Sequence, residues 1–183
     1  EDLQFIILGT GQPQYEEFFK YISSRYPDKM SANIKYDAKL AQKIYAGSDM
    51  FLMPSRFEPC GLGQLISMRY GTLPIVKETG GLKDTVIPYN EYEDTGYGFA
   101  FSDYNAHDML YTIQRALSFY NEEGVWEKLV KRVMKQDFSW KHAAKEYEEL
   151  YQKIVIDKKK VKSKTGDKID INKAKLKELI TLD

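Results

Sequence analysis

The chain has 183 residues, of which 43% are hydrophobic and 30% charged, which is enough apolar material for a folded domain with its own core. Its 27 basic and 27 acidic residues give a formal net charge of zero, which argues against a nucleic-acid binder that works by bulk charge. The single cysteine excludes an internal disulfide and suits a reducing cytoplasm. No apolar run reaches the ~18–20 residues that cross a bilayer.

Short apolar runs alternate with helical patterns along most of the chain. Strands are expected at residues 3–8, 32–35, 50–53, 73–76 and 98–101. Helices are expected up to residue 26, over 39–46 and 62–70, briefly after residue 81, and over 105–121, 123–136 and 139–156. This alternation predicts an α/β fold, a doubly wound, Rossmann-like parallel sheet with helices on both faces. Ligands of such sheets bind beyond the carboxyl ends of the strands, which directs attention to loops 9–11, 54–61 and 77–81.

The end of the chain differs from the rest in charge. Residues 158–183 hold nine lysines and four acidic residues, a net of +5, so the first 157 residues carry a net of −5. We expect residues 158–168 to be a solvated, lysine-rich linker. Residues 169–183 are expected to form a separate short helix, capped by Asn172.

The loop after the third expected strand carries the strongest chemical signal. Its sequence, PSRFEPCGLGQ over residues 54–64, places a carboxylate before two glycines that open a helix. Backbone N–H groups at a helix start can receive phosphate oxygens, and glycines let a ligand approach the backbone closely. Glu58 would then lie beside the ligand and accept hydrogen bonds from sugar hydroxyls. The spacing alone fits equally well a structural acid next to a small core cysteine, Cys60.

Two other positions are weaker candidates when taken alone. Thr79-Gly80-Gly81 follows a buried strand and suits a backbone that touches a phosphate or sugar, although a plain turn is the simpler explanation. Tyr36 follows the second expected strand, where an aromatic ring can stack on a nucleobase, although packing is again the simpler explanation.

Several other classes of site are disfavoured. Gly9-Thr10-Gly11 follows a strand, but Gln14 stands where a dinucleotide fingerprint needs glycine. His107 and His142 fall in expected helices without ligand spacing, so no metal site is predicted. Cys60 has no histidine near it in the sequence, which argues against a nucleophilic role.

Together these motifs resemble a known family. PSRFEPCGLGQLISMRYGTLPIVKETGGLKDTV, within residues 49–86, is similar to the C-terminal half of bacterial glycogen synthases and plant starch synthases. The run DFSWKHAAKEYEELYQKI and the opening FIILGTG also resemble these enzymes, so the likeness covers about residues 1–155. It implies a GT-B fold, in which two Rossmann-like domains face each other across a cleft. Residues 1–157 would form the donor-binding domain.

The resemblance also implies a reaction and a set of site residues. Such enzymes transfer glucose from ADP-glucose to the non-reducing end of an α-1,4-glucan, with retention of configuration and without a metal or other cofactor. Glu58 would be the carboxylate of the catalytic site that contacts the glucose hydroxyls, and Tyr36 would stack on the adenine. The substrate-binding residues around them would be Cys60, Gly61, Leu62, Gly63, Gln64, Thr79, Gly80 and Gly81.

Some features of the family are absent from this sequence. Ile66 stands eight residues after Glu58, where many GT-B enzymes have a second glutamate that the glycogen and starch synthase branch commonly lacks. The resemblance places upstream of Glu1 the first strand of the domain, the Arg and Lys that neutralise the diphosphate, and the N-terminal domain that binds the glucan. The chain alone is therefore expected to be inactive.

The expected partners are ADP-glucose or ADP and, through the upstream domain, an α-1,4-glucan, with no nucleic acid and no membrane. The expected location is the bacterial cytoplasm, or the plastid for a plant chain. A UDP-glucose-using relative and a non-catalytic nucleotide- or glucan-binding domain remain as alternatives. The last 15 residues resemble the first helix of a helix-hairpin-helix module, but the chain stops at Asp183 before any hairpin, so DNA binding is not predicted.

Overall fold

The computed structural model describes residues 2–165, which fall into two compact units. The described part of the first unit is residues 2–136, and that of the second is residues 137–165. The first unit therefore ends before residue 157, the expected end of the donor-binding domain, because the closing helix belongs to the second unit. The short helix expected at residues 169–183 lies outside the described residues.

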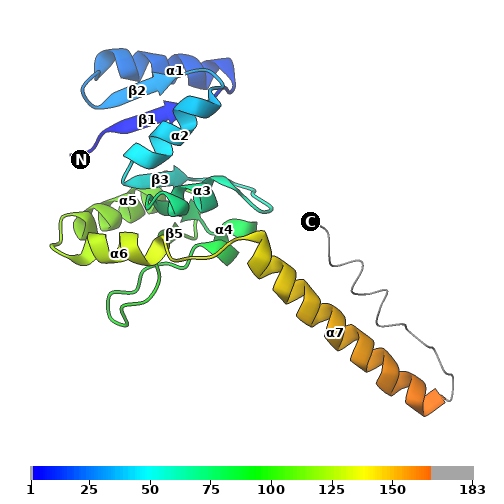
Figure 1. Ribbon diagram of the computed structural model, residues 1–183. Helices are drawn as coiled ribbons and strands as arrows, with labels where there is room; N and C mark the ends of the chain where they lie inside the picture. Colours follow the sequence, from blue (N-terminus) through cyan, green and yellow to red (C-terminus); the bar gives the residue numbers. More distant parts are fainter. Residues whose placement is uncertain (1, 166–183) are drawn as a thin grey trace. The chain divides into compact units, whose positions relative to one another are not determined.

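Strands and helices alternate along the first unit, as the sequence predicts (Figure 1). Its elements are β1 (Phe5–Leu8), α1 (Pro13–Arg25), β2 (Met30–Asn33), α2 (Ala38–Gly47), β3 (Met50–Met53), α3 (Gly63–Arg69), β4 (Leu73–Lys77), α4 (Gly80–Thr85), β5 (Phe99–Phe101), α5 (Ala106–Tyr120) and α6 (Val125–Val133). The largest shift from expectation is β2, which begins at Met30 and ends two residues early. The Lys35 N–H turns back to the Asn33 carbonyl, 3.0 Å away, so the chain leaves the sheet there.

All strand pairs in the first unit are parallel, which confirms the predicted α/β architecture. The strands form two sheets where the sequence predicted one. β1 pairs with β2, and β3, β4 and β5 form a separate three-stranded sheet in that order. Within the described residues, β1 and β3 each pair on one side only, so no backbone ladder joins the two sheets.

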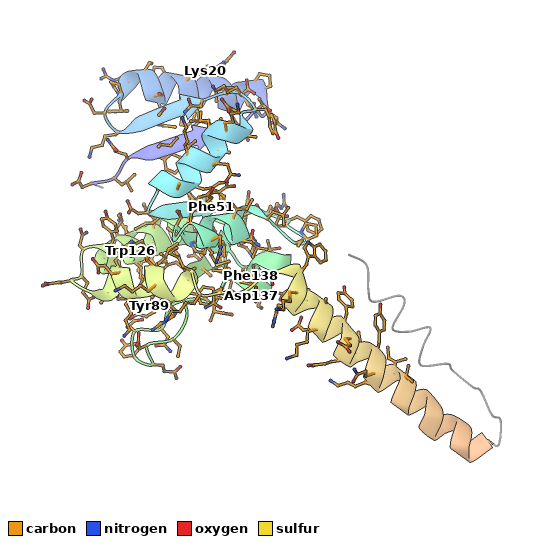
Figure 2. The ribbon with its side chains drawn as sticks, in the orientation of Figure 1. Lys20, Phe51, Tyr89, Trp126, Asp137 and Phe138 are labelled. Carbon is orange, nitrogen blue, oxygen red and sulfur yellow. The ribbon has the colours of Figure 1, made fainter. Side chains whose placement is uncertain are left out.

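The hydrophobic core lies between the three-stranded sheet and helices α5 and α6. Phe99 of β5 is fully buried, with ring centroids 6.2 Å from Phe119 and 6.3 Å from Trp126. Tyr89 packs edge-on against Phe119 in the same cluster. Tyr89 and Trp126, two members of this cluster, are labelled in Figure 2. The Arg115 guanidinium covers the Phe99 ring at 5.8 Å, which closes the cluster toward solvent.

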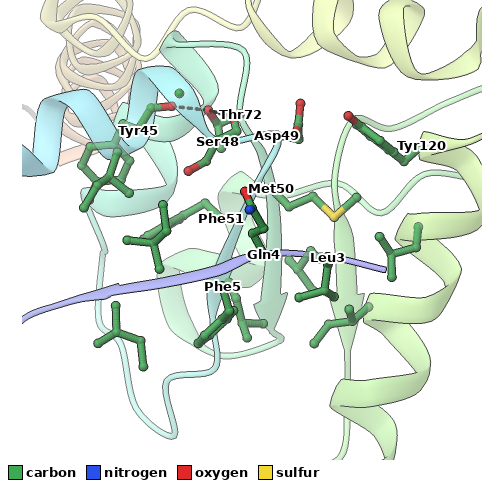
Figure 3. A pocket seen from close by; sticks show the side chains of 18 of the residues that line it. Leu3, Gln4, Phe5, Tyr45, Ser48, Asp49, Met50, Phe51, Thr72 and Tyr120 are labelled. Atoms are coloured by element: carbon green, nitrogen blue, oxygen red, sulfur yellow. Dashed lines mark hydrogen bonds between the residues drawn. The ribbon is translucent and has the colours of Figure 1, made fainter. Parts of the chain in front are cut away.

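An apolar groove of about 810 Å³ lies in the first unit, lined on one side by β1 and on the other by β3 (Figure 3). Side chains of α2 and α5 complete its lining. Beside it, the Thr72 hydroxyl donates to the carbonyls of Tyr45 and Ser48, at 2.5 and 2.8 Å, and ties the end of α2 to the start of β4. None of the expected site residues lines this groove.

The described part of the second unit contains one long helix, α7 (Trp140–Thr165). It continues past residue 156, through most of the segment that the sequence assigned to a linker. The physical reason is local: the first glycine or proline after Trp140 is Gly166, and lysine is a good helix former. No helix within residues 2–165 is both long enough and apolar enough to cross a membrane.

Candidate functional site

Two loops leave neighbouring parallel strands at their carboxyl ends and form the candidate site. Residues 54–62 follow β3 and lead into α3, while residues 78 and 79 follow β4 and lead into α4. Met53 is in register with Val76, so both loops leave the same edge of the sheet. This is the edge at which open α/β sheets bind their ligands.

A glycine pair brings the two loops into backbone contact. The Gly81 N–H donates to the carbonyls of Glu58 and Pro59, at 3.3 and 3.2 Å. A Cβ atom on Gly80 would lie 2.1 Å from the Glu58 carbonyl oxygen, and one on Gly81 would lie 2.2 Å from that of Cys60. Only glycine fits at either position, and Gly80 also has a φ of +43°. The turn that the sequence left open is therefore the contact that shapes the loop bearing Glu58.

The exposed groups of this edge have the chemistry of a polar ligand site. Glu58 is half-buried, Cys60 is exposed, and the Leu62 side chain is 67% exposed. No side chain caps the start of α3, so its first N–H groups have no side-chain acceptor. A carboxylate next to free backbone donors can hold a sugar hydroxyl and an anionic group at the same time.

Gln64 differs in its burial from Glu58, Cys60 and Leu62. Its side chain is fully buried, and its Nε2 donates to the carbonyls of Cys60 and Gly61, at 3.1 and 3.0 Å. The amide therefore holds the loop from beneath instead of facing a ligand. Gly61 adopts the left-handed φ of +76° above it, and a Cβ atom there would lie 2.5 Å from the Gln64 Oε1.

Tyr36 is 89% exposed at the carboxyl end of β2, between that strand and the start of α2. Its neighbour Asp37 caps α2 by accepting from the Leu40 N–H at 2.9 Å and pairs with Lys35. The Leu40 N–H and then Lys35 hold the pKa of Asp37 below its ordinary value. Within residues 2–165, no hydrogen bond or ring contact joins Tyr36 to the Glu58 loop. The structure thus fixes the backbone around this ring and leaves its face open.

Two residues that contact this region, Thr85 and Tyr97, belong to no motif that the sequence identifies as a site. The Thr85 Oγ1 accepts from the Gln64 Nε2 at 3.1 Å and donates to the Gly81 carbonyl at 2.6 Å. The Tyr97 hydroxyl donates to the Thr85 carbonyl at 3.1 Å, and burial raises the pKa of that hydroxyl. Both act through contacts between segments distant in sequence, which no local motif announces.

Other positions singled out from the sequence lie apart from these contacts. The Gly11 N–H in the loop after β1 donates to the Glu16 carboxylate at 2.8 Å, so this backbone donor already has an acceptor within the chain. The residues that the structure describes contain no group of three or more His, Cys, Asp or Glu side chains arranged to hold a metal ion.

The family model for glycosyl transferases group 1 matches residues 1–133. Among curated proteins, the chain is 59% identical over 155 residues to the glycogen synthase of Clostridium novyi and 56% identical over 154 residues to that of Clostridioides difficile. These matches cover 85% and 84% of this chain and 32% of each relative. The chain thus spans about a third of the length of the curated relatives it matches.

Solved structures of glycosyltransferases are similar to this one, and two of them illustrate the likeness. The catalytic domain of starch synthase IV from Arabidopsis thaliana, bound to ADP and acarbose, matches with a TM-score of 0.73 and 39% identity. That match covers 82% of this chain and 32% of the plant chain. Sucrose-phosphate synthase from Thermosynechococcus elongatus matches with a TM-score of 0.58 and 23% identity, over 84% of this chain and 39% of that chain, and shows a shared fold.

Proposed function

Because the chain belongs to the group 1 glycosyl transferases, we propose that it is the donor-binding part of a retaining glucosyltransferase of the glycogen and starch synthase type. The proposed reaction moves glucose from ADP-glucose to the non-reducing end of an α-1,4-glucan. The observation that carries the proposal is the backbone contact between Gly80-Gly81 and the Glu58 loop, which presents a carboxylate beside the start of α3. The identity of 52–59% to bacterial glycogen synthases supports the same assignment and favours the bacterial cytoplasm over a plastid.

Each exposed group has a proposed role in holding the donor. Glu58 accepts hydrogen bonds from the glucose hydroxyls, and the backbone of residues 60–63 faces the sugar and the diphosphate. Fixed N–H dipoles stabilise the charge that develops on a departing diphosphate, which is how a protein promotes this step without a metal. Tyr36 offers an open ring face for the adenine. The ADP in the plant starch synthase structure supports an adenine nucleotide as the donor.

The chain by itself is proposed to bind the donor weakly and to transfer no glucose. It spans about a third of its relatives, and within residues 2–165 no lysine or arginine is paired with Glu58 or lies among the expected donor-binding residues. Diphosphate binding that rests on backbone dipoles alone is expected to be of millimolar strength. A glucose-transfer assay in which the isolated chain turns over like a synthase would contradict this part of the proposal.

The test is an NMR titration of the chain with ADP, ADP-glucose and UDP-glucose. We expect adenine-dependent shifts at residues 36, 58–64 and 79–81, and weaker binding in the variants Tyr36→Ala and Glu58→Gln. Tyr92→Ala and Glu93→Gln are the matched controls, since Tyr92 is as exposed as Tyr36 but lies in another loop. Equal shifts with ADP-glucose and UDP-glucose that survive Tyr36→Ala would favour the UDP-glucose alternative. Donor binding to the whole protein without glucose transfer would favour a non-catalytic binding domain.

A further inference from the structure

The buried amide of Gln64 lies under the loop that presents Glu58. Its two N–H groups are directed to the carbonyls of Cys60 and Gly61 and to the Thr85 hydroxyl, at 3.0 to 3.1 Å. Within the described residues, its Oε1 is buried and has no hydrogen-bond partner. Folded proteins rarely leave a buried polar atom unpaired, so the unpaired Oε1 marks an amide whose N–H groups are committed to the three acceptors around the loop.

Thr85 connects this amide to the second loop. Its hydroxyl accepts a hydrogen bond from Gln64 and donates one to the Gly81 carbonyl, 2.6 Å away. The N–H of the same Gly81 donates to the carbonyls of Glu58 and Pro59. Tyr97 adds a bond from its hydroxyl to the Thr85 carbonyl and anchors the end of α4.

These bonds form a closed ring. Starting at Gln64, the ring runs through Thr85 and Gly81 to the Glu58 carbonyl, and the chain from Glu58 to Gly61 returns it to the Gln64 amide. The segment from 54 to 62 has no helix or strand of its own, so its backbone depends on contacts such as this ring. Bonds of this kind are made cooperatively in a buried setting, so loss of one member loosens the others.

We propose that Gln64 and Thr85 are positioning residues that hold the Glu58 loop in the conformation that receives the sugar of the donor. Neither side chain faces the ligand edge, so both act through the backbone of residues 58–61. The part of this inference that concerns the sugar rests on the proposed function, whereas the ring itself is testable on the unliganded chain.

The first measurement is amide hydrogen exchange at Gly81 in the unliganded chain. Thr85→Val keeps the shape of the side chain and removes the hydroxyl, so we expect the Gly81 amide to exchange about tenfold faster. Thr85→Ser keeps the hydroxyl and should restore slow exchange. Thr112→Val is the matched control, because the buried Thr112 also donates to the carbonyl four residues earlier, that of Asp108, but lies in α5.

Two results would overturn the ring as an ordering device. One is unchanged exchange at Gly81 in Thr85→Val, and the other is equal acceleration at Gly81 in Thr85→Val and Thr112→Val. Gln64→Met is the second variant, since it removes both N–H donors at nearly constant volume. It should also make the Gly81 amide exchange faster, as Thr85→Val does.

The second measurement compares the affinities of each variant for ADP and for ADP-glucose. We expect Thr85→Val to weaken ADP-glucose binding about tenfold while binding of ADP changes less than twofold, because Glu58, whose carbonyl belongs to the ring, is the proposed contact of the glucose hydroxyls. Equal loss for both ligands would indicate a merely structural role and overturn the positioning proposal. Absence of any nucleotide binding by the unsubstituted chain would contradict the proposed function, while the exchange result would still decide whether the ring orders the loop.

Discussion

The two regions of the first unit differ sharply in how they are packed. Among the residues that the structure describes, every buried hydrophobic one lies from Met68 to Val133, whereas α1 and α2 contain no buried residue. Four residues of β4 are buried in succession, whereas the first two residues of β1 are exposed. The region from β3 to α6 therefore has a core of its own, and the region from β1 to α2 does not.

The sheet topology explains this difference. β1 and β2 pair only with each other, and the groove between β1 and β3 leaves apolar side chains of both strands partly open. The links to the second region are side-chain contacts at the end of α2, such as the Tyr70 hydroxyl to Gln42 and the Tyr45 ring against Phe51. A two-stranded sheet whose helices contain no buried residue is only marginally stable, so the two regions should differ in stability as well as in packing.

The largest expected contrast is between two phenylalanines. Phe99→Ala removes a fully buried ring from the core and should lower the free energy of unfolding by ~3–5 kcal/mol. Phe18→Ala removes a ring that is 54% exposed on α1 and should cost about 1 kcal/mol or less. Urea unfolding of both variants, followed by circular dichroism, measures the two costs. Equal costs would show that the first region is packed in solution as tightly as the second.

The second largest expected contrast is in how readily the two regions open locally, which hydrogen-exchange rates report. The amides of Phe5 and Gly9 donate to carbonyls within the first region, and the Leu73 amide donates to the Asp49 carbonyl within the second. We expect the first two to exchange with solvent on the order of 100-fold faster than the third, because β1 opens without unfolding the core. Native-state hydrogen exchange followed by NMR gives all three rates in one sample. Uniform protection across the three amides would contradict the division into two regions.

The same contrast extends to the glycines after β1 and β4. A Cβ atom on Gly11 would meet nothing within 4 Å, whereas one on Gly81 would lie 2.2 Å from the Cys60 carbonyl oxygen. Gly81→Ala should therefore cost ~1–3 kcal/mol of stability and shift the NMR signals of residues 58–61. Gly11→Ala is the control and should leave both nearly unchanged. Similar shifts from the two substitutions would indicate that the Glu58 loop adapts freely to the extra methyl group.

The sequence predicted the elements better than their assembly. Apolar runs located β3 and β4 to within a residue, since a buried strand needs such a run wherever it lies. The division into two sheets was missed, because strand patterns record burial and not which strands pair. The extension of α7 was missed because a lysine-rich stretch fits a solvated linker and an exposed helix equally well.

For the candidate site as well, the sequence indicated single residues but not the contacts that join them. Glu58 and the glycine pair stood out because their residue types are unusual after a strand, and the structure brings them together. The sequence did not show that the Gln64 side chain is buried under the loop, and the contact with Thr85 was missed. Their hydrogen bond joins residues 21 positions apart, so only the folded backbone shows it. Positioning contacts of this kind have no periodic signature in a sequence.

The smallest expected effect concerns a loop of the second region that charges hold in place. Asp94, at a φ of +52°, pairs with Lys128 and Arg132, and Arg132 also donates to the Gly96 carbonyl at 2.8 Å. Hydrogen bonds from Lys128 and then Arg132 hold the pKa of Asp94 below its ordinary value. The pairing therefore stabilises the fold at pH values above the ordinary pKa, near 4, and this contribution is lost as the pH falls through the lowered pKa.

Asp94→Asn tests this contribution, because asparagine tolerates the left-handed backbone while removing the charge. We expect the melting temperature of the variant to lie a little below that of the unsubstituted chain at pH 7, with the gap closing as the pH falls toward 2. Asp84→Asn, at an exposed position on α4, is the control for loss of one negative charge. A gap that stays constant with pH would mean that the loop is held by its backbone hydrogen bonds and that charge pairing adds nothing to the order of the second region.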